Sequence, residues 1–296
     1  MKKLQTLTGA KLKSIVIILL TFFVFESAAQ SFYHQNHDRR WLFTAGTGIT
    51  SYFGELANPG DYLDAKPNLN FGLERKLNTK WGVRTELTWY QIAGSDAEAS
   101  DASRRERNLS FKSNNFEINI EALWMFFREG VRFYQRRVVN PYLLGGIGLT
   151  HFTPKTDYEG ITYNLRKYKT EDIDYGSTAL VLPVGFGFRL RLSHILNLNF
   201  EGGYRITFTD HLDDVSTSYI ATEGIEDPVR VALIDRRPEL GLQPAEPGTQ
   251  RGNPEQNDGY AIFNIKVEYY LPSHLIFPPK DKQQGSGKKK HRKMIE

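Results

Sequence analysis

Apolar and polar residues alternate along many segments of this chain with a period of two. In the segment 81–91, one set of alternate positions holds Trp81, Val83, Thr85, Leu87 and Trp89, and the set between them holds Gly82, Arg84, Glu86, Thr88 and Tyr90. This period is typical of a β-strand whose two faces meet different surroundings. The polar face is rich in glycine and in charges of both signs, whereas the apolar face ends in aromatic residues. The pattern is typical of a transmembrane β-barrel with lipid outside and a polar lumen inside.

The alternation predicts eight strands and no helix of useful length. The predicted strands are Trp41–Phe53, Asn68–Lys76, Trp81–Ile92, Asn115–Phe127, Pro141–Phe152, Thr178–Leu192, Leu196–Phe208 and Tyr260–Leu271. Most of them exceed the roughly 9–11 residues that a tilted strand needs to cross the hydrocarbon of a membrane.

The connections between the predicted strands alternate in length. Short ones fall at 78–79, 128–140 and 193–194, and long ones at 54–67, 93–114, 153–177 and 209–259. Outer-membrane barrels have short periplasmic turns and long outer loops, and an even strand number places both termini on one side. The predicted fold class is therefore all-β, an eight-stranded antiparallel transmembrane β-barrel of the OmpA-like kind. We expect it in a bacterial outer membrane, in contact with the lipid, with both termini in the periplasm.

The inward face of the predicted strands carries as many acids as bases. The acids are Glu74, Glu86, Glu117, Glu121, Glu201 and Glu268, and the bases are Lys76, Arg84, Arg189, Arg191, Arg205 and Lys266. An unpaired buried charge is costly, so these residues are candidates for ion pairs within the lumen. The interior of an eight-stranded barrel is just wide enough for side chains to fill it. We therefore predict a closed polar lumen rather than a diffusion pore.

Aromatic residues near the strand ends predict a girdle at each membrane surface. The periplasmic girdle would hold Trp41, Trp81, Trp124, Tyr142 and Tyr269, and the outer one Phe53, Trp89, Phe152 and Phe208. Pro183 lies within a predicted strand but has no backbone N–H to donate, so we expect a β-bulge there.

The two ends of the chain have compositions of their own. Four lysines, an apolar run over Ile15–Phe25 and the small residues before Gln30 predict a signal peptide over 1–29, cleaved between Ala29 and Gln30. The barrel would then occupy 30–271 with a short periplasmic segment before its first strand. Residues 272–296 include five Lys or Arg between 288 and 293, and they predict a disordered, basic periplasmic tail.

Composition excludes several classes of function. The chain has no cysteine, which removes disulfides and thiol chemistry. Its net charge of +4 arises at the two ends, because acids outnumber Lys and Arg in the remainder. We therefore expect no nucleic-acid partner.

One polar cluster follows the seventh predicted strand. It holds Asp210, His211, Asp213, Asp214 and Ser216. It has three interpretations: a hydrolytic Asp/His or Ser/His site at the barrel mouth, a carboxylate calcium site, or the start of a loop with solvated acids. The sequence favours the third, because no second motif accompanies the cluster. We therefore expect no catalytic residues, no cofactor and no bound metal.

Two further basic clusters each have two interpretations. Arg104, Arg105 and Arg107 lie in a long loop and could bind lipopolysaccharide phosphate or a protein, or be solvated beside neighbouring acids. The basic run at 288–293 could bind acidic lipid headgroups or a periplasmic partner, or serve as a solubilising tail.

Five segments resemble the sequence pattern of PorG-type proteins. They are GTGITSYFGEL at 46–56, RRERNLSFKSNNFEINIEALW at 104–124, NPYLLGGIGLTHFTP at 140–154, ALVLPVGFGFRL at 179–190 and EGGYRITFTDHLDDVSTSYI at 201–220. The resemblance covers about residues 46–219, and its last segment is the most specific. His211 stands where that family usually has tyrosine.

This resemblance implies an outer-membrane barrel of the type IX secretion system of Bacteroidota. PorG-like proteins are associated with the periplasmic PorK/PorN ring and are needed for export of proteins with a C-terminal type IX signal, in some species also for gliding motility. The expected function is thus a non-enzymatic anchor or scaffold of that ring. The alternatives are a barrel-mouth hydrolase or lipid-modifying enzyme, and a general structural or surface barrel of the OmpA type.

Overall fold

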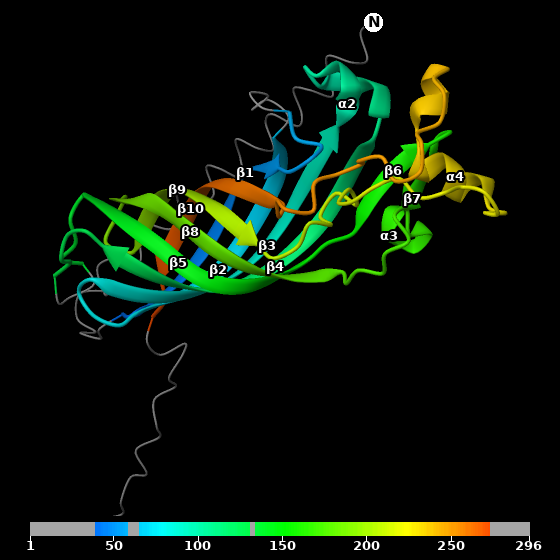
Figure 1. The fold of residues 1–296 in the computed structure, drawn as a ribbon. Coiled ribbons are helices and arrows are strands. Elements are labelled where there is room, and N and C mark those ends of the chain that lie inside the picture. The colour runs from blue at the N-terminus through cyan, green and yellow to red at the C-terminus, as the bar shows by residue number, and fades with distance from the viewer. Residues whose placement is uncertain (1–38, 59–64, 131–133, 273–296) are drawn as a thin grey trace, which may run out of the picture. The chain divides into compact units, whose positions relative to one another are not determined.

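The computed structural model describes residues 39–58, 65–130 and 134–272, and these residues form an eight-stranded barrel with a cap of loops at one end (Figure 1). The barrel strands are β1 (Trp41–Phe53), β2 (Lys66–Lys76), β3 (Trp81–Ser95), β4 (Ser110–Met125), β5 (Val139–His151), β8 (Thr178–Arg191), β9 (Leu196–Thr207) and β10 (Gly259–Tyr270). The predicted signal peptide, its cleavage site at Ala29 and Gln30, and the predicted tail from 273 onward lie outside the described residues.

The barrel is closed by antiparallel pairing all the way round. Each strand pairs with its two neighbours, β3 pairs with β4, and β1 pairs with β10 from Leu42 opposite Tyr270 to Phe53 opposite Gly259. In Figure 1 the blue β1 lies beside the orange β10. Closure gives the backbone groups of every barrel strand partners on both sides, which hydrocarbon cannot supply. The predicted fold class, a closed eight-stranded antiparallel barrel, is confirmed.

The outside of the barrel is apolar and the inside is charged. On β3 and β4 the outward Leu87 and Phe116 are 57% and 61% exposed, whereas the inward Arg84 and Glu86 are fully buried. Water-soluble proteins bury their apolar residues and expose their charges. The reversed arrangement requires lipid as the outer solvent, so this is a transmembrane barrel. No helix among the described residues has the length and apolarity to cross a membrane.

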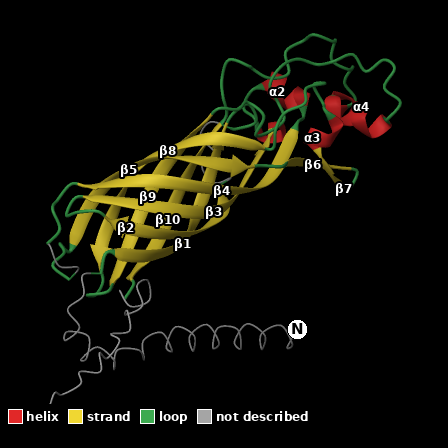
Figure 2. Ribbon diagram, turned by 90° about the horizontal axis from the view of Figure 1, so that it is seen from below, coloured by secondary structure: helices red, strands yellow, loops and turns green. Residues whose placement is uncertain are grey.

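The long connections build the cap. They contain η3 (Asp96–Glu98), α2 (Ala102–Arg107), the hairpin of β6 (Pro154–Tyr158) and β7 (Ile161–Asn164), α3 (Leu165–Tyr168), α4 (Pro228–Ile234) and η4 (Arg237–Leu240). Figure 2 shows these short helices gathered beyond one end of the strands. The β6–β7 turn places Glu159 and Gly160 at positive φ, as a two-residue hairpin requires. The sequence analysis predicted neither the hairpin nor the longer β3 and β4, which pair with each other up to Ser95 opposite Ser110.

The cap has an apolar core of its own. Its buried side chains come from the barrel rim and from all four long connections: Tyr52, Leu56, Tyr90, Ile92, Leu109, Phe111, Phe152, Leu165, Ala179, Leu212, Val215, Leu233, Tyr260 and Ile262. Burial of apolar area stabilises this packing by roughly 25 cal/mol per Å². The cap is therefore a packed layer rather than a set of independent loops.

Three local predictions were wrong. Tyr142 and Phe152 are buried, at 0% and 1% exposed, so neither belongs to an aromatic girdle. Pro183 causes no bulge, because the pairing of β8 keeps one register along its length with β9. On the side of β5 the ladder is interrupted between Gly145 and Gly148 but resumes in the same register. The missing donor is thus accommodated by a gap in one ladder rather than by an inserted residue.

The lipid-facing side of the wall can be tested by Ile120→Arg. Ile120 is 54% exposed and lies midway along the outward apolar positions of β4. Arginine on the lipid face near the midplane should lower the free energy of unfolding by about 2–4 kcal/mol. Equilibrium urea unfolding of the protein in phospholipid vesicles measures this loss. Ile120→Ala, which introduces no charge, is the control, and equal losses for both variants would contradict a hydrocarbon contact here.

Candidate functional site

The middle of the lumen is occupied by a compact network of opposite charges. Arg84 donates to Glu121 at 2.5 Å and to Glu201 at 2.8 Å. Lys266 donates to Glu86 at 2.7 Å and to Glu201 at 2.6 Å. These side chains are at most 3% exposed. Each of the three acids is bonded to at least one of the two bases, so the chain itself compensates most of this buried charge.

Further ion pairs lie above and below this network. Toward the short turns, Arg189 donates to Glu74 at 2.6 Å and to Glu268 at 2.7 Å. Toward the cap, the Nε of Arg205 lies 3.5 Å from Glu117. The predicted lumen residues named as ion-pair candidates are buried inside the barrel, except for Lys76, which is half-buried, and Arg191.

Arg191 differs from its prediction. It is the last residue of β8, it is exposed, and it donates to the carbonyl of Arg136 at 2.7 Å. At this level the wall ends, so an inward position opens to solvent. Arg136, from the connection between β4 and β5, fills the inside instead, where it bonds to Asn197 and lies 4.3 Å from the ring of Tyr270. The sequence analysis missed Arg136 because it lies outside every predicted strand.

Tyrosine hydroxyls complete the lumen and were not predicted there. Tyr142 donates to Glu201 at 2.7 Å, and Tyr260 donates to Glu117 at 2.6 Å. The parity of β5 carried a usable signal, because Tyr142 has the same even numbering as Gly146 and Gly148, and glycine marks the polar face of this alternation. Gly187 makes room for this ring, since a Cβ there would lie 2.4 Å from the tyrosine. The filled interior indicates a closed lumen.

The polar cluster after β9 is folded into the cap. Asp213 accepts from the N–H of Val215 at 2.9 Å and from Tyr52 at 2.7 Å. Asp214 accepts from Thr170 and Tyr175, both at 2.5 Å. Asp210, Asp213 and Asp214 are 8%, 0% and 2% exposed. The interpretation of these acids as solvated is therefore wrong, because the connection between β5 and β8 and the rim of β1 cover them.

His211 and Ser216 are placed for packing. The ring of His211 stacks on Tyr175 with centroids 4.5 Å apart. The N–H of Ser216 donates to Glu171 at 2.9 Å. In the described part of the chain, no hydrogen bond joins the imidazole of His211 to Asp210, Asp214 or Ser216. A nucleophile and its base must lie within hydrogen-bond reach, and this arrangement does not provide that contact.

Burial shifts the proton affinities of the cap acids. It raises the pKa of Asp210 to about 7 and that of Asp214 to about 6. Burial and mutual repulsion also hold the pKa values of Asp213 and Asp258 well above the usual range. Burial would raise the pKa of Glu171 too, but the charge of Arg251 and hydrogen bonds to this carboxylate hold it below its usual value.

A polar cleft of about 460 Å³ opens on the cap. Arg104, Arg107, Arg237 and Arg251 line it together with Glu55 and Tyr219. The first two of these arginines also bind the buried Asp96, at 3.2 and 2.7 Å. Arg105 instead donates to the carbonyl of Ala99. The cleft therefore presents guanidinium groups, whose donor geometry suits carboxylate or phosphate.

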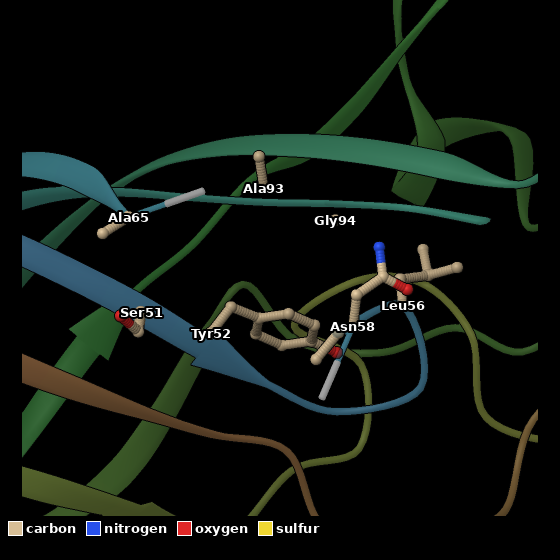
Figure 3. A pocket seen from close by; sticks show the side chains of 8 residues that line it. Ser51, Tyr52, Leu56, Asn58, Ala65, Ala93 and Gly94 are labelled. Carbon is tan, nitrogen blue, oxygen red and sulfur yellow. The ribbon is translucent and has the colours of Figure 1, made fainter. Parts of the chain in front are cut away.

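A second pocket lies between the ends of β1 and β3 and is shown in Figure 3. Its lining includes Ser51, Tyr52, Leu56, Asn58 and Gly94. Its volume is about 40 Å³, which has room for no more than a few water molecules. It is too small to bind an organic substrate.

A closed barrel with an apolar exterior, an ion-paired lumen and a cap of long loops defines an outer-membrane β-barrel protein. The chain matches the family described as "Domain of unknown function (DUF6089)" over residues 14–223, and it belongs to that family. No curated protein sequence matches it.

Several solved outer-membrane barrels are similar to this chain at low identity. Neisserial surface protein A is 12% identical with a TM-score of 0.42, covering 78% of this chain and 97% of that one. Ail of Yersinia pestis, in complex with the heparin analogue sucrose octasulfate, is 8% identical with a TM-score of 0.38, covering 79% and 99%. The N-terminal barrel domain of Pseudomonas aeruginosa OprF is 8% identical with a TM-score of 0.37, covering 79% and 98%. Similarity at this level says nothing about function.

We expect Arg84→Met, in the lumen network, to lower the free energy of unfolding strongly. The substitution leaves Glu121 and Glu201 buried beside fewer cations, which should cost about 3–5 kcal/mol of the free energy of unfolding. Guanidinium unfolding in detergent micelles measures it. Adding Glu121→Gln to the variant should recover part of the loss, whereas Lys167→Met, at an exposed lysine, should change little. An unchanged unfolding midpoint for Arg84→Met would rule out the network as a stabilising element.

The buried Asp214 should make the stability of the cap depend on pH. Burial raises the pKa of Asp214 to about 6 in the folded cap, whereas an unfolded chain releases this proton near the usual pKa of 3.8. The stability due to this proton is therefore fully present only below pH 3.8 and is lost as the pH rises through 6. Asp214 has φ 71°, which asparagine also adopts.

Asp214→Asn should therefore fold and should remove this part of the pH dependence. Limited proteolysis of the cap between pH 4 and pH 7 measures it. The parent cap should become easier to cleave, relative to the variant, as the pH rises. Parallel profiles for parent and variant would mean that Asp214 does not titrate in this range.

Proposed function

We propose that this barrel is an outer-membrane component of the type IX secretion machinery that anchors or scaffolds the periplasmic PorK/PorN ring. The observation that carries the proposal is the resemblance of the segment 201–220 to the corresponding PorG-type segment. In the structure this segment runs from the middle of β9 into the interior of the cap, where it contacts the connection between β5 and β8 and the rim of β1. The resemblance thus concerns residues on which the folding of the cap depends.

The filled lumen supports a role as scaffold rather than as conduit. Ion pairs and tyrosines occupy the barrel interior from Glu74 and Arg189 near the short turns to Glu117 and Arg205 near the cap. A folded cargo protein could not pass through an eight-stranded barrel, whose interior is only wide enough for side chains. Contacts with the ring would instead use the short-turn end, which in this proposal faces the periplasm.

Both described chain ends lie at that same end of the barrel. Arg39 donates to the carbonyl of Tyr270 at 3.0 Å, and the N–H of Leu271 donates to Trp41. The turns after β2 and β8 lie there too, because they close strands of the same antiparallel wall. In this proposal the N-terminal segment, the tail and the short turns together form the surface that meets the ring.

We also propose that the chain is not an enzyme. The residues that could have formed a hydrolytic site at the barrel mouth, Asp210, His211 and Ser216, are buried or stacked in the cap. A general structural barrel of the OmpA type is the remaining alternative, and the experiment below distinguishes it.

Deletion of the gene should cause cargo with a C-terminal type IX signal to accumulate in the periplasm. Affinity purification of the tagged barrel from native membranes should recover the ring proteins. The structural-barrel alternative predicts normal export and no ring proteins in the purification, and that result would refute the proposal. Truncation after Pro279 tests the tail, because unchanged recovery of the ring would remove the tail from the contact surface.

A further inference from the structure

Four carboxylates, three of them buried, meet where two connections of the cap converge. Glu55 follows β1, Asp210 and Asp213 follow β9, and Asp258 immediately precedes β10. Carboxylate oxygens of Glu55, Asp210 and Asp258 all lie within 4.8 Å of one another. We call these four residues the acid cluster. Asp210, Asp213 and Asp258 are 8%, 0% and 2% exposed, so water does not solvate their charge.

No basic side chain in the described ranges neutralises the acid cluster. None of its four members has a Lys, Arg or His nitrogen within 4.0 Å among residues 39–58, 65–130 and 134–272. Arg107 is in the region, but its Nε and Nη2 donate to Asp96 at 2.7 and 2.8 Å. Grouped carboxylates in a dry environment repel one another strongly. Their charge must therefore be removed by protons or balanced by a cation from outside the chain.

Several oxygens of the acid cluster have no hydrogen-bond donor. Both carboxylate oxygens of Asp210 and the Oε2 of Glu55 are buried and have no donor in hydrogen-bond geometry among the described residues, although the Ser216 side chain lies near Asp210. A buried carboxylate oxygen without a partner destabilises the fold, because its lost hydration is not replaced. Asp210, which is more than nine-tenths buried, is directed at the oxygens of Glu55 and Asp258. These free oxygens are available as ligands.

The remaining oxygens are held in place by the backbone and by Tyr52. Asp258 accepts from the N–H of Leu212 at 2.9 Å, and Glu55 accepts from the N–H of Asn253 at 3.1 Å. The hydroxyl of Tyr52 lies 2.7 Å from both Asp213 and Asp258. A hydroxyl has one proton to donate, so it can satisfy only one of these acids at a time. The arrangement fixes the carboxylates but does not neutralise them.

The lumen offers an internal comparison. Glu86, Glu121 and Glu201 also bring three carboxylate oxygens within 4.8 Å of one another. There, however, Arg84 and Lys266 lie among the acids at 2.5–2.9 Å. In the lumen, the grouped carboxylates are thus compensated by buried bases of the chain itself. The acid cluster has the same density of carboxylates without them.

We propose that Glu55, Asp210 and Asp258 bind a divalent cation, with Ca²⁺ as the best fit. All of the donors are carboxylate oxygens, and hard oxygen ligands of flexible geometry suit Ca²⁺ rather than a transition metal. Asp210 supplies two free oxygens and Glu55 supplies one, while Asp213 orients Tyr52. Glu55 also lines the arginine cleft, which gives an ion a route from solvent. The cation would link the connection after β1 to both ends of the connection between β9 and β10.

This proposal changes the interpretation of the polar cluster after β9. The sequence analysis considered a calcium site in the cluster of Asp210, His211, Asp213, Asp214 and Ser216, but favoured the start of a loop with solvated acids. In the structure, Asp214 instead accepts hydrogen bonds from Thr170 and Tyr175. The carboxylates that lie beside Asp210 are those of Glu55 and Asp258, which come from distant segments. The ligand set therefore could not be assembled from the cluster alone.

Calcium titration of the full-length protein tests the proposal. The protein in detergent micelles, first treated with a chelator, is titrated with CaCl₂ by calorimetry, and its thermal unfolding is followed with and without Ca²⁺. We expect one binding event with a dissociation constant on the order of 10⁻⁵ to 10⁻³ M. Because the ion binds the folded state, the unfolding midpoint should rise with its concentration. Absence of binding and an unchanged midpoint would overturn the proposal.

Matched variants assign the site. Asp210→Asn keeps the shape of the side chain and should weaken Ca²⁺ binding by about tenfold or more. Glu226→Gln removes one charge at an exposed position of the same connection and should leave binding unchanged. If Asp210→Asn does not fold, Glu55→Gln at the edge of the cluster replaces it. Calcium binding that is equally tight in the cluster variants would place the ion elsewhere and refute this site. None of these measurements requires the secretion partners.

Discussion

Hydrocarbon offers no hydrogen-bond partner to a backbone amide, and the architecture of this protein follows from that constraint. Each barrel strand must pair on both sides, so the sheet closes where β1 meets β10. Closure forces alternate side chains into an interior that lipid cannot reach and water barely enters. Charged residues placed there must neutralise one another, and Arg84 and Lys266 do this among Glu86, Glu121 and Glu201. The result is a wall of paired strands around a core filled with side chains.

The cap is held together by different interactions from those of the barrel. Its apolar core joins four connections, so that Leu212 from the segment after β9 packs with Leu56, Phe111 and Phe152. Its acid cluster lacks the paired bases that the lumen contains, although Asp96 and Glu171 elsewhere in the cap bind arginines. The two regions therefore respond differently to their surroundings. The lumen depends on fixed charges of the chain, whereas the cap depends on protons or a bound cation, and the cap is the part in which solution conditions can change stability.

Local sequence predicted the strands well because period-two alternation is imposed by the contrast between lipid and lumen. It failed where that contrast ends. The outer parts of β3 and β4 were missed because Ser95 and Ser110 stand where the outside is water and cap rather than lipid. Phe152 was assigned to a girdle because an aromatic residue at a strand end gives the same sequence pattern whether it contacts lipid or a covering loop. Arg191 was placed in the lumen by parity, but parity does not show where the wall stops.

The sequence by itself determined the number of barrel strands, which face of each meets lipid, and the presence of charges of both signs inside, because these follow from neighbours along a single strand. It did not determine which acids lie together. Glu55, Asp210 and Asp258 come from three segments far apart in the chain, and their meeting depends on barrel closure and on the packing of the long connections. That information lies in non-local contacts, so only the tertiary structure shows one group of carboxylates supplied with bases and another without them.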